Sequence, residues 1–422
     1  MNTKRFTFLL VSLTLILAAC APAMDANTDS VTVPPPLEDV APSPVTEEDP
    51  TSSPPAEKTT EPIADEQPAL ELELQPGQQP PGGSESEFST DFDKTIISYD
   101  EVLSGGPPKD GIPSIDHPTF VSVDEADAWL ADVEPVILIE AGGVAKAYPI
   151  QILMWHEIVN DSVGQVPLSI TFCPLCNTAI AYERTIDGQI LDFGTTGRLR
   201  YSNLIMYDRQ TETWWQQASG QAIAGELTGS QLVFYPAAIL SWNDFQQTYP
   251  QGEVLSRDTG LGRPYGQNPY AGYDDINKPP FLYDGPTTPD ELLPMARVLT
   301  VDLNGKTVAY PYDLLEATGV INDEIGGQPI AVFWQSGTAS ALDTGAIAQG
   351  RDVGTAAAFS RKANGEVLNF INQDGKIVDS NGKGWNILGR SSSGEQLTPV
   401  VAINHFWFSW AAFKPETRVY QP

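Results

Sequence analysis

The sequence predicts a β-rich α+β protein, in which two internally duplicated halves pack as one unit behind a disordered N-terminal tether. Three observations lead to this prediction: motifs that recur at an offset of 162 residues, hairpin signals that open each copy, and an N-terminal stretch with almost no core-forming residues. The 422 residues are enough for two or three ordinary domains. We expect the first half at residues 93–255, a linking loop at 256–297 and the second half at 298–422.

Charge and composition limit the kinds of partner and site that we expect. The chain has 23 Lys and Arg against 55 Asp and Glu, a net charge of −32. Nucleic acid is therefore not an expected partner, because phosphate backbones are bound by Lys and Arg surfaces. Docking on anionic lipid through a basic patch is disfavoured for the same reason. Three Cys cannot form a disulfide framework, and three His leave little for a His-rich metal site.

Residues 1–20 are typical of an export signal with a lipoprotein processing site. Lys4 and Arg5 precede an apolar run that is too short to remain as a membrane-spanning helix. The run ends in Leu17-Ala18-Ala19-Cys20, which resembles a bacterial lipobox. This pattern predicts that Cys20 is lipidated and that the protein is anchored through this lipid to a membrane of the cell envelope, on the extracytoplasmic side.

Residues 21–92 are predicted to be a disordered acidic tether. This stretch contains 14 Pro, a single Lys and very few aromatic residues. Such a composition buries too little apolar surface to offset the entropy lost on ordering. Proline and like-charge repulsion favour an extended chain.

The internal repeat organises the rest of the chain. Repeats of this kind indicate duplicated supersecondary units. The matching pairs appear in the same order in both copies: Ala147-Tyr148-Pro149 with Ala309-Tyr310-Pro311, Asn160-Asp161 with Asn322-Asp323, Gly164 with Gly326, and Ser241-Trp242 with Ser409-Trp410.

Each copy is expected to run from a hairpin through one helix into several strands. Gly142-Gly143 and Asn304-Gly305 lie between apolar runs, which is a hairpin signal. The first helix is predicted from Pro149 to about Val159, because proline suits the first helical position. Strands are expected at 166–172, 178–186, 189–193, 203–208 and 213–217, with a turn at Asp187-Gly188.

One local cluster contains residues suited to metal binding or redox chemistry. Cys173-Pro174-Leu175-Cys176 follows a predicted strand, and His156 lies on the preceding helix. Two thiols at this spacing can clasp one metal ion or form a redox disulfide. Thiolates select soft ions, so copper or zinc bound by His156, Cys173 and Cys176 is the first hypothesis.

Two further hypotheses stay open for the same cluster. Cys173 and Cys176 are candidate catalytic residues of a thiol–disulfide or other redox enzyme. Alternatively, they form a structural disulfide in a non-catalytic ligand-binding or adhesion module whose protein or small-molecule partner is unknown. In the oxidising exterior an uncomplexed pair is expected to be a disulfide. A thioredoxin fold is disfavoured, because residues 178–186 alternate like a strand where that fold needs a helix.

The second copy provides an internal comparison. At the same offset, His156 corresponds to Thr318, Cys173 to Gln335 and Cys176 to Thr338, so the reactive residues occur only in the first copy. This difference predicts one functional site and a structural second copy.

Two weaker ligand-binding candidates lie further along the first copy. Arg198 ends the run Gly194–Arg198, whose backbone N–H groups are capable of holding an anion, although a plain glycine-containing turn is the simpler interpretation. Asp208 precedes Arg209 in a predicted turn, where a solvated ion pair is the simpler interpretation.

Several motifs together resemble a known family. Across roughly residues 105–420 the chain is similar to the family called domain of unknown function 3179. The resemblance implies an exported or membrane-anchored bacterial or archaeal protein, and it supplies no activity, substrate or cofactor. The motifs that carry it are His156-Glu157-Ile158-Val159-Asn160-Asp161, Phe172-Cys173-Pro174-Leu175-Cys176-Asn177-Thr178-Ala179, Asp192-Phe193-Gly194, Ser202-Asn203-Leu204-Ile205-Met206-Tyr207-Asp208-Arg209, Asn268-Pro269-Tyr270-Ala271-Gly272-Tyr273-Asp274 and Phe406-Trp407-Phe408-Ser409-Trp410.

Overall fold

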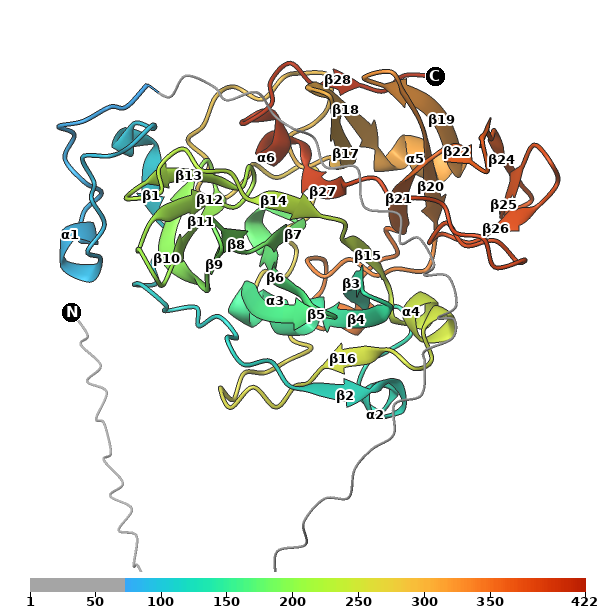
Figure 1. The fold of residues 1–422 in the computed structure, drawn as a ribbon, viewed down its shortest axis with the longest axis horizontal. Coiled ribbons are helices and arrows are strands. Elements are labelled where there is room, and N and C mark those ends of the chain that lie inside the picture. Colours follow the sequence, from blue (N-terminus) through green and yellow to red (C-terminus); the bar gives the residue numbers. More distant parts are fainter. Residues whose placement is uncertain (1–72) are drawn as a thin grey trace, which may run out of the picture. The chain divides into compact units, whose positions relative to one another are not determined.

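The structure is a computed structural model that describes residues 73–422 (Figure 1). Strands account for 40% of the described residues and helices for 13%, so the predicted β-rich fold with few helices is confirmed. Within residues 73–422, no helix has the length and apolar character needed to cross a membrane. The predicted signal peptide, Cys20 and most of the predicted tether lie outside the described residues.

Three larger sheets and one two-stranded sheet make up the first half. The first has the order β15-β3-β4-β16-β2, the second β14-β7-β6-β5 and the third β1-β10-β11-β12-β13. Their strands, in chain order, are β1 (Val102–Ser104), β2 (Phe120–Ser122), β3 (Pro135–Ala141), β4 (Val144–Pro149), β5 (Ile158–Val163), β6 (Val166–Cys173), β7 (Thr178–Glu183), β10 (Phe193–Arg200), β11 (Asn203–Asp208), β12 (Trp214–Gln216), β13 (Gln221–Ala224), β14 (Val233–Tyr235), β15 (Ala238–Ser241) and β16 (Glu253–Leu255), with the small hairpin β8 (Thr185–Ile186) and β9 (Gln189–Ile190).

Two larger sheets and two small ones make up the second half. Their orders are β27-β17-β18-β28, β19-β20-β21, β24-β25-β26 and β22-β23. Their strands are β17 (Arg297–Leu303), β18 (Lys306–Pro311), β19 (Val320–Ile325), β20 (Gln328–Gln335), β21 (Thr355–Ser360), β22 (Lys362–Ala363), β23 (Glu366–Val367), β24 (Phe370–Gln373), β25 (Lys376–Asp379), β26 (Gly384–Trp385), β27 (Ala402–Phe406) and β28 (Arg418–Val419).

The helices are short, and five of the six begin directly after a strand. They are α1 (Ser84–Glu87), α2 (Val123–Asp127), α3 (Ile150–His156), α4 (Trp242–Thr248), α5 (Tyr312–Thr318) and α6 (Trp407–Ala411).

The same element order occurs in both halves. In each, an antiparallel hairpin (β3–β4, β17–β18) leads through a seven-residue helix (α3, α5) into a second antiparallel hairpin (β5–β6, β19–β20). A tyrosine on the first hairpin donates a hydrogen bond to an aspartate on the second. The Oη–Oδ2 distance is 2.6 Å from Tyr148 to Asp161 and 2.8 Å from Tyr310 to Asp323.

One of the apolar clusters of the described residues contains large aromatic side chains from both halves. Its first-half members include Trp242 and Phe245 of α4, and its second-half members include Phe333 of β20 and Phe370 of β24. These side chains are at most 1% exposed. Fully burying an aromatic side chain contributes roughly 2–3 kcal/mol, so neither half is complete without the other.

Two predicted elements are wrong in detail. The helix expected to reach Val159 ends at His156, because Glu157 has a φ of 57° and residues 158–163 form strand β5 instead. The expected turn over Gly194–Arg198 lies inside strand β10, whose pairing with β11 shifts register between Thr195 and Arg198. A β-bulge of this kind accommodates an extra residue in one strand, so the strand continues through the glycines.

The predicted tether extends too far into the fold. It was expected to run to residue 92, yet Phe88 and Phe92 are buried against Trp214 with ring centroids 5.3 and 5.2 Å away. Glu87 also accepts two hydrogen bonds from Arg198, at 3.1 and 3.2 Å. The aromatic side chains pack this segment against the sheet that contains β10 to β13. The average composition of residues 21–92 did not predict this packing, because the stretch as a whole has few aromatic residues.

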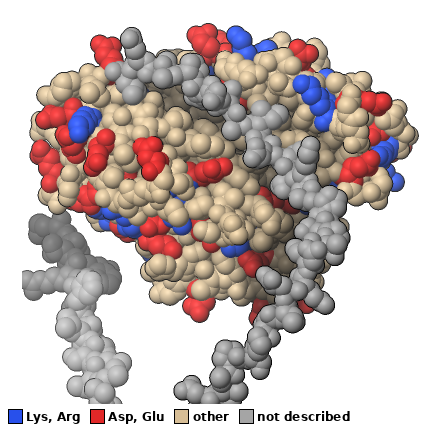
Figure 2. All heavy atoms as spheres, viewed as in Figure 1, with Lys and Arg blue, Asp and Glu red and all other residues tan. Residues whose placement is uncertain are grey.

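The surface of the described residues is acidic, as the composition requires. On the face drawn in Figure 2, Asp and Glu side chains outnumber Lys and Arg and are scattered over the surface.

Phe88→Ala should lower the free energy of unfolding by about 3 kcal/mol, because it leaves a cavity between Tyr207 and Trp214. Urea denaturation of the full chain measures this loss. Ile190→Ala is the control, since Ile190 is 48% exposed and its truncation should change stability by less than about 0.5 kcal/mol. Equal stability of both variants would show that residues 84–92 do not contribute to the folded unit.

Candidate functional site

The Cys-Pro-Leu-Cys motif forms the tight connection between strands β6 and β7. Cys173 ends β6 and pairs with Thr178, the first residue of β7. A single 3₁₀ turn, Pro174–Cys176, fills the gap, and Asn177 closes it in the left-handed conformation. Both cysteines are therefore held by the antiparallel ladder of the hairpin.

Both cysteines are buried free thiols. Cys173 is 2% and Cys176 0% exposed, and neither forms a disulfide. The two sulfurs share one acceptor, since Cys176 Sγ lies 3.4 Å and Cys173 Sγ 3.9 Å from the carbonyl oxygen of Ser202. The amide of Asn203 donates to Cys176 Sγ at 3.3 Å. The expectation of a disulfide in the metal-free protein is therefore wrong for this structure, and the β6–β7 ladder holds the turn without one.

The surroundings keep the Cys173 thiol protonated. Burial raises the pKa of the Cys173 thiol well above its ordinary value, and the neighbouring Cys176 and Glu157 raise it further. Lysine, arginine or protonated histidine beside a thiol would lower its pKa. Within residues 73–422, no such cation contributes to the pKa shift of Cys173. The resting Cys173 thiol is therefore a weak nucleophile.

His156 does not join the cysteines. Its Nδ1 lies 2.7 Å from the carbonyl oxygen of Pro113, so Nδ1 carries the proton and donates it. Its Nε2 lies 2.6 Å from Tyr265 Oη and accepts from that hydroxyl. The predicted His156, Cys173 and Cys176 metal-ligand set is therefore not assembled. Across the described range, no three or more His, Cys, Asp or Glu side chains are arranged to hold a metal ion.

Glu157, which follows His156, is hydrogen-bonded through its backbone to the strand that ends at Cys173. Its backbone accepts a 2.8 Å hydrogen bond from the N–H of Phe172, the residue before Cys173. Its side chain is 8% exposed, and burial raises the pKa of its carboxyl to about 8. Among residues 73–422, no donor hydrogen-bonds this carboxyl and no cation pairs with it.

The backbone of Glu157 is in an unfavourable conformation. With φ 57° and ψ −30°, it caps the C-terminus of α3 in a region that costs a non-glycine residue about 1 kcal/mol or more. The matching cap of α5 is Gly319, with φ 69° and ψ −29°. Glycine adopts this conformation without a steric penalty.

The loop between the halves covers the cysteine turn. Tyr273 Oη donates a 2.9 Å hydrogen bond to the carbonyl oxygen of Leu175 and accepts one from the N–H of Phe281. Ser202 Oγ donates to the carbonyl oxygen of Phe281 at 2.7 Å. Tyr270 packs against the same apolar cluster as the thiols, and the charges of Glu157 and Cys173 contribute to its raised pKa.

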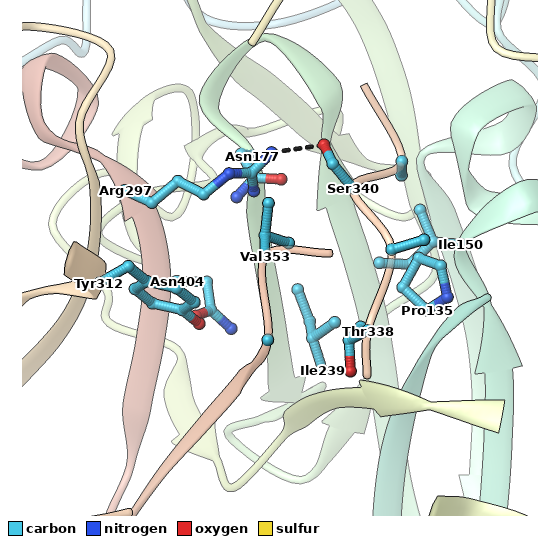
Figure 3. A pocket seen from close by; sticks show the side chains of 13 residues that line it. Pro135, Ile150, Asn177, Ile239, Arg297, Tyr312, Thr338, Ser340, Val353 and Asn404 are labelled. Atoms are coloured by element: carbon cyan, nitrogen blue, oxygen red, sulfur yellow. Dashed lines mark hydrogen bonds between the residues drawn. The ribbon is translucent and has the colours of Figure 1, made fainter. Parts of the chain in front are cut away.

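A small cavity lined by both polar and apolar residues lies where the motif meets the second half. It has a volume of about 20 Å³, enough for roughly one water molecule. Figure 3 shows Asn177 beside Arg297, whose guanidinium donates a 2.6 Å hydrogen bond to Ser340 Oγ. Asp274 of the linking loop also binds Arg297 and Ser340, which fixes that loop to the second half.

The two weaker ligand candidates have structural roles. Arg198 is 4% exposed, and its guanidinium pairs with Glu87. Asp208 is fully buried and accepts hydrogen bonds from Thr211 and from Trp215 Nε1. Neither residue is free to bind a ligand.

His405 contacts the motif from the second half. Its Nδ1 lies 2.9 Å from Thr178 Oγ1, and that hydroxyl in turn donates to the carbonyl oxygen of Cys176 at 3.1 Å. Burial lowers the pKa of His405 to about 3, so the ring is neutral at pH 7.

Comparison with protein families gives one result. The model of the family described as "Protein of unknown function (DUF3179)" matches residues 109–417. The chain belongs to this family. The matched range contains the cysteine turn, Glu157 and the linking loop, so the whole site lies within the DUF3179 region. Comparisons with curated proteins and with solved structures find no match.

The sequence carried a signal for Glu157 that residue-type reasoning missed. Aligning the two copies at the offset of 162 pairs Glu157 with Gly319, and a glycine after a helix indicates a left-handed cap. Tyr270 and Tyr273 had no comparable signal, because only the folded loop brings them to the cysteines.

The stability of the protein should depend on pH through Glu157. Its folded pKa of about 8 lies above the ordinary value of 4.5, so folding favours the protonated form. This stabilisation is complete below pH 4.5 and is lost as the pH rises toward 8, with a slope of up to about 1.4 kcal/mol per pH unit.

Glu157→Gln should flatten this dependence between pH 5 and 8, as measured by urea denaturation at several pH values. Glu85→Gln is the control, because Glu85 is exposed. An unchanged slope in Glu157→Gln would show that the carboxyl is already ionised in the folded protein.

Proposed function

We propose that Cys173 and Cys176 form a dithiol–disulfide couple, and that the protein is a thiol redox protein of the cell envelope. One observation carries this proposal: one free thiol precedes a three-residue turn, a second ends it, and the two share the carbonyl oxygen of Ser202. Thiols at this spacing form a disulfide without rearrangement of distant segments. Oxidation passes two electrons and two protons to the disulfide of a partner, which becomes a dithiol.

Copper or zinc binding by the same thiols stays a prediction. Thiolates select Cu(I) and Zn(II), but structural zinc sites use four protein ligands. Since His156 is bound to Pro113 and Tyr265, only the two thiols remain of the set predicted from the sequence. The redox proposal needs nothing beyond these two residues, which is why we favour it.

Oxidised glutathione should convert the wild-type protein to a form 2 Da lighter with a Cys173–Cys176 disulfide, and dithiothreitol should reverse the change. Cys176→Ser should stop at a mixed disulfide with glutathione, because no second thiol is present to release it. Mass spectrometry of the intact chain reads both results.

Gln335→Ser is the matched control, since Gln335 ends β20 as Cys173 ends β6, and it should react like wild type. Metal analysis of protein purified without oxygen runs in parallel. A pair that stays reduced in oxidised glutathione, together with one equivalent of copper or zinc lost in Cys173→Ser, would replace the redox proposal with the metal-binding one.

We also propose that the protein is a lipoprotein. The support is the Lys4-Arg5 start, the apolar run and Leu17-Ala18-Ala19-Cys20, followed by an acidic proline-rich stretch. An acidic surface does not bind anionic lipid, so a covalent lipid is the attachment that this chain can use.

Cys20→Ser should release the protein from the membrane fraction and remove the mass of the lipid. Fractionation and mass spectrometry of the bacterial product measure this. Equal membrane association of the variant would reject lipidation at Cys20.

We infer, finally, that the two halves, residues 93–255 and 298–422, derive from one duplicated unit. The shared order of hairpin, helix and hairpin supports this, as do the paired Tyr148–Asp161 and Tyr310–Asp323 hydrogen bonds. Asn160 bonds the backbone of Phe193 as Asn322 bonds that of Phe370, with distances of 2.7–3.0 Å.

A further inference from the structure

We propose that the small cavity between the two halves is a binding site for one water molecule, which joins the cysteine turn to the second half. Four observations support this: the position of the cavity, the free polar atoms that line it, the balance of charge around it and its volume. The inference goes beyond the proposed redox function and does not depend on it, because nothing in it requires the thiols to react.

The cavity lies where corresponding parts of the two halves meet. Its lining includes three pairs of residues that match at the offset of 162: Pro135 with Arg297, Ile150 with Tyr312, and Asn177 with Ala339. The first pair begins strands β3 and β17, and the second begins helices α3 and α5. Junctions between structural units are common places for bound molecules. Of the three first-half residues in these pairs, Asn177 is the polar one.

Three side chains in the lining have polar atoms that no described residue satisfies. Asn177 and Asn404 are each 7% exposed. Within residues 73–422, the amide group of Asn177 has no hydrogen-bond partner, and that of Asn404 uses only its Oδ1, which accepts from the Tyr312 hydroxyl. Arg297 donates to Asp274 through Nη2, whereas its buried Nε has no partner among the same residues. Figure 3 shows all three side chains in the lining of the space.

These free atoms match the hydrogen-bonding capacity of water. Buried polar groups are nearly always satisfied by protein or by ordered water. Arg297 Nε–H and Asn404 Nδ2–H are donors, and Asn177 Oδ1 is an acceptor. One water molecule accepts from both donors and donates to the acceptor, and buried waters typically make about three such bonds.

The charge around the cavity favours a neutral molecule over an anion. Arg297 pairs with Asp274 at 2.6 Å. Arg351 pairs with the same carboxylate at 2.9 Å and with Asp343 at 2.9 Å. Two guanidinium groups are therefore matched by two carboxylates, and no positive charge is left over. An anion would bring an uncompensated negative charge into a buried space, which is unfavourable.

The volume limits the size of the occupant. The cavity measures about 20 Å³, and one water molecule needs about 10–15 Å³ of such space. Together with the balanced charge, this volume selects a single water molecule over any larger ligand.

The proposed water provides a second link between the cysteine turn and β27. Asn177 closes that turn, and the next residue, Thr178, has its Oγ1 2.9 Å from Nδ1 of His405 in β27. Asn177 and Asn404 directly precede these two residues, so the direct link and the water-mediated link arise from adjacent positions in both segments. The side chain that follows Cys176 is thereby bonded to the second half.

A high-resolution crystal structure of the full chain, from crystals soaked in sodium bromide, tests the site directly. We expect one peak of water density bonded to Arg297 Nε, Asn404 Nδ2 and Asn177 Oδ1, without an anomalous signal. An anomalous bromide peak in the cavity would overturn the proposal, because the occupant would then be an anion. An empty cavity, or density bonded to none of these three atoms, would overturn it as well.

A count of long-lived internal waters by oxygen-17 relaxation dispersion tests the same site in solution. Asn404→Leu removes the amide donor and keeps a similar side-chain volume. This variant should hold one long-lived water fewer than wild type, and its melting temperature should fall by roughly 2–4 °C. Asn381→Leu is the matched control and should change neither quantity, because Asn381 is exposed and lies outside the lining. An unchanged water count in folded Asn404→Leu would contradict the proposal; if this variant does not fold, the wild-type crystal structure decides.

Discussion

The left-handed cap that ends α3 is the constraint on which the site depends. At Glu157 the chain reverses from helix into strand β5 within one residue, and the same residue bonds Phe172 at the end of β6. The β5–β6 ladder begins at the next pair, Ile158 with Thr171, and Cys173 lies two residues further along β6, where it pairs with Thr178 of β7. In the second half Gly319 makes the corresponding reversal before β19. One backbone conformation therefore precedes the second hairpin in both halves, and in the first half the residue that adopts it carries a buried carboxyl.

Burial of the thiols comes from the whole chain, not from the hairpin alone. Ser202 precedes β11, Tyr273 belongs to the linking loop, and His405 lies in β27 of the second half. The linking loop is held in place by Asp274, which is 2% exposed and binds Arg297 of the second half. The second half thus has a definite structural contribution: it supplies part of the shared core and the anchor for the loop that covers the thiols, although its own copies of the reactive positions are Gln335 and Thr338.

Sequence patterns predicted the strands around the site more reliably than they predicted which side chains make up the site. The strand before Cys173 and the strand after Asn177 were expected, because apolar and alternating runs report directly on β structure. The grouping of His156 with the cysteines was wrong, because proximity along the chain does not show which way a side chain points. At the end of α3, the His156 side chain is hydrogen-bonded to Pro113 and Tyr265. A one-residue change of direction at a helix cap is not encoded in spacing.

The sequence by itself determined the β-rich class, the family and the cysteine turn, since each depends on local periodicity or on motifs that are contiguous in the chain. Only the tertiary structure decided that Phe88 and Phe92 belong to the folded unit, that Arg198 and Asp208 are structural, and that Tyr270 and Tyr273 surround the thiols. The physical reason is that these roles arise from contacts between segments that are far apart in the sequence. Examples are the hydrogen bond between Tyr273 and Leu175 and the ring contact between Phe88 and Trp214. Such contacts depend on burial and on the direction of each side chain, and both are set only when the sheets of the two halves pack together.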